Sequence, residues 1–207
     1  MKRLVLPLLL WLAAALPARA SDMTYEGCLS QVETAPATAL TSAQAWNAAG
    51  GGAPAAHCVA LALVALNRYG EAAQVLERIA NDPGSGTSEA RAELLAQAGN
   101  AWLLANEPGH GNDDLTRALV FAPGDIGLLY DRARARLMSK SYGGAMEDIN
   151  AVLAQMPSDG SALLLRAKLR SLTGDPAGAR ADALAVLEDE RNDSETKAAA
   201  QAILDAS

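Results

Sequence analysis

Aromatic side chains are scarce in this 207-residue chain, at 4% of the sequence with a single phenylalanine. β-Sandwiches and barrels draw on strands rich in aromatic and β-branched residues, so this scarcity argues against them. Alanine and leucine are abundant instead, and both favour helices. The composition therefore predicts an all-α protein whose helices can approach one another closely.

Positively charged residues are outnumbered, with 17 lysines and arginines against 24 aspartates and glutamates. A nucleic-acid surface needs a basic patch or stripe. Arg132, Arg134 and Arg136 alternate along one segment, but residues two apart on a helix lie on nearly opposite faces. The sequence therefore argues against nucleic acid as a partner.

Histidine and cysteine, the usual zinc ligands, occur only twice each. A closed structural zinc site usually needs four such ligands. No Ser–His–Asp arrangement, carboxylate pair or Cys–His dyad stands in a context that suits nucleophilic or acid–base chemistry. We therefore expect no catalytic residues, no cofactor and no metal.

No apolar run approaches the roughly 20 residues that a membrane-spanning helix needs. The longest, Leu4 to Leu16, follows Lys2 and Arg3 and precedes Ala18-Arg19-Ala20. This order is typical of a secretory signal peptide. We expect cleavage after Ala20 and a periplasmic or secreted protein, whose 14 basic and 24 acidic residues give a formal net charge of −10.

Both cysteines, Cys28 and Cys58, follow that leader. An even number of cysteines in an exported chain favours a disulfide, because the compartment is oxidising. The alternative is two small buried apolar side chains that do not meet. We expect a Cys28–Cys58 disulfide between neighbouring helices.

A 34-residue period runs through the second half of the chain, where 92–125, 126–159 and 160–193 align without a gap. An earlier segment, 56–88, fits with one residue fewer. Small residues recur at two places of each segment, where two helices would touch. They are Gly99, Ala133 and Ala167 at the eighth place, and Gly111, Ala145 and Ala179 at the twentieth.

This pattern resembles the tetratricopeptide repeat family, whose 34-residue unit is a helix, a tight turn, a second helix and a closing proline. The resemblance implies an all-α, right-handed solenoid of antiparallel helix hairpins. It divides the chain into a signal peptide (1–20), a divergent N-terminal helix pair (21–53), four units within 54–193, and a C-terminal capping helix (194–207).

Local signals mark the turns of these hairpins. Gly174, Asp175 and Pro176 suit a left-handed turn residue, a helix N-cap and a first helical residue. The Gly- and Pro-rich segment from Glu107 to Asn112 is expected to be a turn.

Two arginine–aspartate pairs recur within the units. Arg132 precedes Asp148 by sixteen residues, and Arg166 stands in the same relation to Asp182. These positions can face each other in an antiparallel hairpin, so we expect two structural ion pairs.

The resemblance also implies a function, because the concave face of such a solenoid can hold a peptide or a partner's helix. We expect a non-enzymatic interaction module or scaffold of the bacterial cell envelope. Arg134 and Lys168 beside apolar side chains predict an acidic, partly apolar ligand. Two alternatives are a carrier of a small apolar envelope ligand and an accessory subunit of a cell-wall complex. The expected groove residues are His57, Asn100, Leu103, Tyr130, Arg134, Leu137, Leu164 and Lys168.

Overall fold

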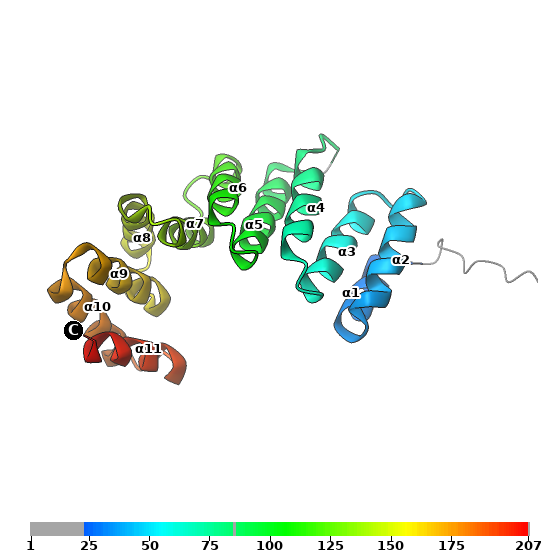
Figure 1. Cartoon of the computed structure of the whole chain (residues 1–207). Coiled ribbons are helices and arrows are strands. Elements are labelled where there is room, and N and C mark those ends of the chain that lie inside the picture. The colour runs from blue at the N-terminus through cyan, green and yellow to red at the C-terminus, as the bar shows by residue number, and fades with distance from the viewer. Residues whose placement is uncertain (1–22, 85, 207) are drawn as a thin grey trace, which may run out of the picture.

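The computed structural model describes residues 23–84 and 86–206, and these form eleven helices without a strand (Figure 1). The expected signal peptide lies outside the described residues. No helix in the described ranges is long and apolar enough to cross a bilayer. The all-α prediction is confirmed. The helices are α1 Tyr25–Thr34, α2 Pro36–Ala48, α3 Gly52–Ala65, α4 Tyr69–Asn81, α5 Ser88–Leu104, α6 Pro108–Phe121, α7 Ile126–Met138, α8 Tyr142–Gln155, α9 Gly160–Thr173, α10 Pro176–Glu188 and α11 Ser194–Asp205.

Consecutive helices pair into hairpins, from α1 with α2 to α9 with α10, and α11 packs against α9 and α10. The second helices α6, α8 and α10 begin at Pro108, Tyr142 and Pro176, 34 residues apart. α5 departs from this register, because Thr87 caps it and Ser88 already begins the helix. The expectation of a turn from Glu107 to Asn112 is wrong, since Pro108 starts α6 and its ring suits a first helical residue.

Each of the four hairpins from α3/α4 to α9/α10 turns through a residue with positive φ. These residues are Asn67, Asn106, Lys140 and Gly174, with φ of 58°, 61°, 61° and 84°. The prediction for Gly174 is confirmed. Asp175 caps α10 by accepting a hydrogen bond from the Gly178 backbone N–H at 2.9 Å, as its sequence context predicts.

The small residues of the repeat lie where the helices of a hairpin meet. Ala133, Ala145 and Ala179 are fully buried, as is Ala167. In the α5/α6 hairpin the two backbones approach closely, because a Cβ atom on Gly111 would lie 3.0 Å from the Gly99 carbonyl oxygen. The predicted interior positions are confirmed.

The hairpins stack into a curved array (Figure 1). First helices of successive hairpins contact one another, α5 with α7 and α7 with α9, and α9 also contacts α11. Second helices of successive hairpins make fewer contacts. The first helices α3, α5, α7 and α9 therefore form the inner, concave side of the array.

Two buried aspartates, Asp148 of α8 and Asp182 of α10, each join the two helices of one of the last two repeat hairpins. Arg132 donates to Asp148 from Nε at 2.9 Å and from Nη2 at 2.7 Å. Arg166 donates to Asp182 with the same pair of distances. The predicted ion pairs are confirmed. A second arginine one helical turn on, which the sequence reading did not assign, also binds each carboxylate: Arg136 at 2.8 Å and Arg170 at 2.7 Å.

Asp114 of α6 occupies the equivalent place of the preceding hairpin without those arginines. Ala98 and Trp102 stand where the next unit has its two arginines. Asp114 is only 3% exposed, and Arg117 donates to one of its oxygens at 2.7 Å. Burial, and then the neighbouring Glu77 carboxylate, raise the pKa of Asp114 to about 7.

Candidate binding groove

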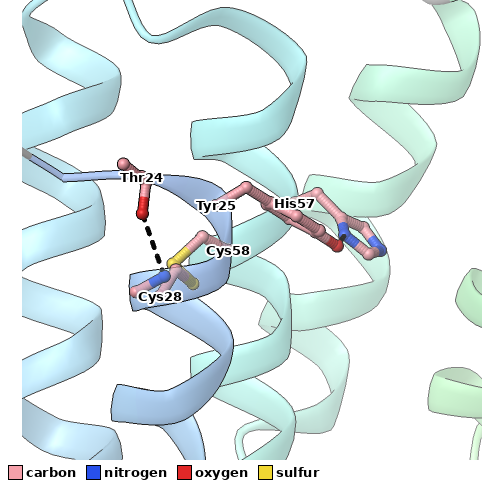
Figure 2. The surroundings of a disulfide bond; sticks show 6 residues. Thr24, Tyr25, Cys28, His57 and Cys58 are labelled. Carbon is pink, nitrogen blue, oxygen red and sulfur yellow. Dashed lines mark hydrogen bonds between the residues drawn. A yellow bond between two sulfur atoms is a disulfide. The ribbon is translucent and has the colours of Figure 1, made fainter.

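A disulfide fixes the N-terminal end of the concave face. Cys28 of α1 and Cys58 of α3 are bonded, with Cα atoms 6.1 Å apart, and neither side chain is exposed (Figure 2). Thr24 starts α1 by accepting a hydrogen bond from the Gly27 N–H at 3.1 Å. The disulfide holds α1 against the first repeat hairpin, so that α1 lies at the edge of the concave face.

A chain of hydrogen bonds crosses three helices beside this disulfide. Gln97 of α5 donates from Nε2 to Glu93 at 2.9 Å, so its oxygen faces His57 Nε2 at 2.7 Å. His57 Nε2 must then carry the proton, which leaves Nδ1 to accept from the Tyr25 hydroxyl at 2.6 Å (Figure 2). Burial raises the pKa of Tyr25, so its hydroxyl keeps the proton that it donates. The side chains of α1, α3 and α5 are thus held in one arrangement.

The first hollow of the concave face opens beside this chain, between α1, α3 and α5, with a volume of about 420 Å³. Tyr25, His57 and Gln97 form its polar edge, and Pro54 and Leu94 belong to its apolar lining. Because the polar atoms along this edge already bond one another, the hollow presents a fixed and mostly apolar surface.

A second hollow of about 430 Å³ lies between α3, α5 and α7 and is also lined by Glu93 and Gln97. The two hollows therefore adjoin each other along α5. Leu61 and Ala96 belong to the lining of the second hollow, and Asn100 and Asp131 contribute polar atoms. We refer to the two hollows together as the N-terminal groove.

Asn100, Asp131 and Arg134 form a closed polar cluster between α5 and α7. Asn100 donates to Asp131 at 2.6 Å, and Arg134 donates to Asp131 at 3.1 Å and to Asn100 at 3.3 Å. The Arg134 charge is therefore already matched by a carboxylate of the same helix.

A third hollow, of about 480 Å³, lies at the other end of the concave face between α9 and α11. Leu164, Leu172 and Ile203 line it with apolar surface, and the exposed Lys168 stands among them. We call this hollow the C-terminal groove.

The structure sorts the groove residues expected from sequence into three groups. His57 and Asn100 line the N-terminal groove, and Leu164 and Lys168 line the C-terminal groove. Tyr130 and Leu137 are half-buried and pack against the core of the last two repeat hairpins, and Arg134 belongs to the closed cluster.

The assignment of Leu103 to the groove is wrong. Leu103 is only 5% exposed, and it packs over the side of Gly111, where a Cβ atom would come within 3.1 Å of its Cδ2. The missing side chain at Gly111 draws Leu103 into the α5/α6 interface. The adjacent Leu104, which is 58% exposed, lines the second hollow in its place.

The sequence reading missed Tyr25, Glu93, Gln97 and Asp131. The spacing of Asp131 and Arg134, three residues apart on one helix, indicates an ion pair that could have been read from sequence. Tyr25 gives no such signal, because it lies in the N-terminal cap outside the repeat.

The concave face offers binding surface and fixed polar groups. Within the described ranges, no group of three or more histidine, cysteine, aspartate or glutamate side chains is arranged to hold a metal. Both ring nitrogens of His57 are occupied by hydrogen bonds.

No protein-family model and no curated protein matches the sequence. Solved structures do match the fold. The pilus biogenesis factor PilW aligns at 17% identity over 87% of this chain and 83% of its own, with a TM-score of 0.71. YrrB, a TPR protein with an unusual peptide-binding site, aligns at 15% identity over 88% and 93%, with a TM-score of 0.68. The first TPR of Spaghetti (RPAP3), bound to the HSP90 peptide SRMEEVD, aligns at 25% identity over 59% and 98%, with a TM-score of 0.51.

Proposed function

The chain has the tetratricopeptide repeat fold, and from this premise we propose that it is a non-enzymatic interaction module that binds a peptide or a partner protein through its concave face. The observation that carries the proposal is the N-terminal groove of two adjoining hollows, along which Tyr25, His57 and Gln97 are fixed by hydrogen bonds to one another. A preorganised surface of this kind loses little entropy on binding an extended segment or a helix. The RPAP3 domain binds an HSP90 peptide and YrrB has a peptide-binding site, and because both share the fold they support the same role here.

We place this module in the cell envelope, as a scaffold for a partner there. The proposal is supported by the leader-like first twenty residues and by the disulfide, since disulfides persist in oxidising compartments. PilW, a type IV pilus biogenesis factor, has a similar fold.

An acidic, partly apolar segment suits the C-terminal groove. Lys168 is exposed there beside Leu164, Leu172 and Ile203, so it can pair with a carboxylate while the apolar side chains of the partner are buried. Charge reversal, Lys168→Glu, should weaken capture of such a partner and leave the fold intact, because exposed substitutions usually change stability by about 0.5 kcal/mol or less.

Site-specific photo-crosslinking in the native envelope tests the concave face. A photoreactive residue in place of Leu104, which lines the second hollow and is 58% exposed, should trap a partner. Val120 of α6 is the matched control, since it is an apolar residue 73% exposed outside that lining. Equal trapping from both positions would contradict binding by the concave face. A stoichiometric small apolar ligand in the mass spectrum of the purified protein would favour a carrier instead.

A further inference from the structure

The charges along the N-terminal groove differ in sign from those that the sequence suggested. Glu93, Asp125 and Asp131 line the second hollow, and Glu93 also lines the first. In the described part of the chain, no lysine or arginine lines either hollow. Arg134, which lies on α7 one turn from Asp131, pairs with Asp131 at 3.1 Å. Two carboxylates are therefore left without a cation at the groove.

These two carboxylates, Glu93 and Asp125, lie on the exposed rim, while the lining between them is apolar. Glu93 accepts from Gln97 through one oxygen. Asp125 caps α7 by accepting from the Leu128 N–H at 3.0 Å. Neither is paired with a basic side chain in the ion pairs of the described residues. Leu61, Ala96 and neighbouring apolar residues supply the surface that a partner's apolar side chains would bury.

We propose that the N-terminal groove binds a cationic, partly apolar segment of a partner protein, with lysine or arginine side chains meeting Glu93 and Asp125 and apolar side chains lying on Leu61 and Ala96. This inference rests on the proposed function of the concave face and assigns the chemistry of the ligand for this half. The net charge of the whole chain, −7, steers a cationic segment toward the groove and an acidic one away. Apolar contacts provide the affinity and the rim charges provide selection by sign.

The test uses the full chain without its leader and fluorescein-labelled peptides of leucine, serine and either lysine, glutamine or glutamate, matched in length. Fluorescence anisotropy measures each affinity. We expect the lysine peptide to bind about tenfold more tightly than the glutamate peptide at moderate salt. Raising the salt from about 0.1 M to 1 M shortens the Debye length from about 10 Å to 3 Å and should remove most of that difference.

Two double variants then locate the charge effect. Glu93→Gln with Asp125→Asn removes both rim charges but keeps the helix cap, since asparagine also caps helices. Each exposed ion pair contributes modestly, so we expect the lysine peptide to bind about fivefold more weakly. Glu147→Gln with Asp113→Asn changes the net charge equally at exposed positions outside both hollows, and should change affinity less than about twofold.

A blocking variant separates this inference from the proposed function. Ala96→Trp fills the lining of the second hollow and should abolish binding of the lysine peptide. If Ala96→Trp abolishes binding while the rim variants leave it unchanged, the concave face binds but the cationic assignment is wrong. If binding survives Ala96→Trp, the N-terminal groove is not the site, and the proposed function loses the observation that carries it. Equal or tighter binding of the glutamate peptide, or no binding of any peptide, overturns the cationic assignment.

Discussion

The same substitution at two equivalent places of the repeat should have opposite effects on stability. Asp114 and Asp148 are each 3% exposed, at the same position of successive hairpins. Asp148→Asn removes the carboxylate that Arg132 and Arg136 share. Loss of one partner of a buried ion pair costs about 3–5 kcal/mol. The two arginine side chains remain 16% and 22% exposed, so water relieves part of this cost and we expect a loss of about 3 kcal/mol.

Asp114→Asn should instead stabilise the protein at alkaline pH. The pKa of Asp114 is raised from 3.8 to about 7 in the fold, so the folded state holds an extra proton between these values. The contribution of protonated Asp114 to the free energy of unfolding is fully present below pH 3.8 and is lost as the pH rises to about 7. At about 1.4 kcal/mol per pH unit the loss is a little over 4 kcal/mol for an isolated group, and it is smaller here because Asp114 is hydrogen-bonded to Glu77.

Asparagine stays neutral at every pH, so Asp114→Asn removes this loss. It also removes the Asp114–Arg117 pair, which contributes about 1 kcal/mol or less because Arg117 is 43% exposed. We expect a net gain of about 1–2 kcal/mol at pH 8 and little change at pH 5.

Urea unfolding followed by helical circular dichroism, at pH 5 and pH 8, measures both variants against the parent protein. If the free energy of unfolding has the same slope against urea concentration in all three proteins, they expose the same surface on unfolding and their stabilities can be compared directly. Should Asp114→Asn lose as much stability at pH 8 as Asp148→Asn does, Asp114 would be an ionised partner of Arg117, and the reasoning from burial and Glu77 would be refuted.

Three further predictions concern the disulfide, the hairpin interior and a turn. Replacing Cys28 and Cys58 together by alanine should cost about 3 kcal/mol, because the bond closes a loop of 30 residues, and alkylation of the unreduced, unfolded protein should label no thiol. Ala145→Leu should cost about 1–3 kcal/mol by overpacking a fully buried position, so an unchanged melting temperature would contradict its placement. Gly174→Ala should cost about 1 kcal/mol through its positive φ alone, measured by urea unfolding, since a Cβ there meets no atom within 4 Å.

The sequence by itself determined the class of the fold and the interior of each hairpin. A 34-residue period can be read without coordinates, because every unit must bury the same helix faces against its own partner helix and its neighbours. The positions of Ala133 and Ala145 follow from that period. So do the Arg132–Asp148 pair and its copy one unit later, since sixteen residues bring two positions face to face within any hairpin of this length.

The groove depended on contacts that the period does not encode. Tyr25, His57 and Gln97 bond across separations of 32 and 40 residues, and one member comes from the N-terminal cap. Leu103 and Leu104 are equally apolar in the sequence, and only the close approach of Gly111 decides which is buried. The hydrogen-bond or packing partner of a surface side chain often lies on another helix, so it is known only when the helices are placed in three dimensions.

The charge of the binding face shows most clearly the difference between what the sequence predicts and what the tertiary structure decides. From sequence, Arg134 is a basic residue at a groove position, and it predicts an acidic ligand. In the fold its guanidinium is matched by Asp131 and bonded to Asn100, so it brings little net charge to the groove. The period indicates which helices form the concave face, whereas the sign of the charge on that face follows from pairing between neighbouring helices, which only the tertiary structure decides.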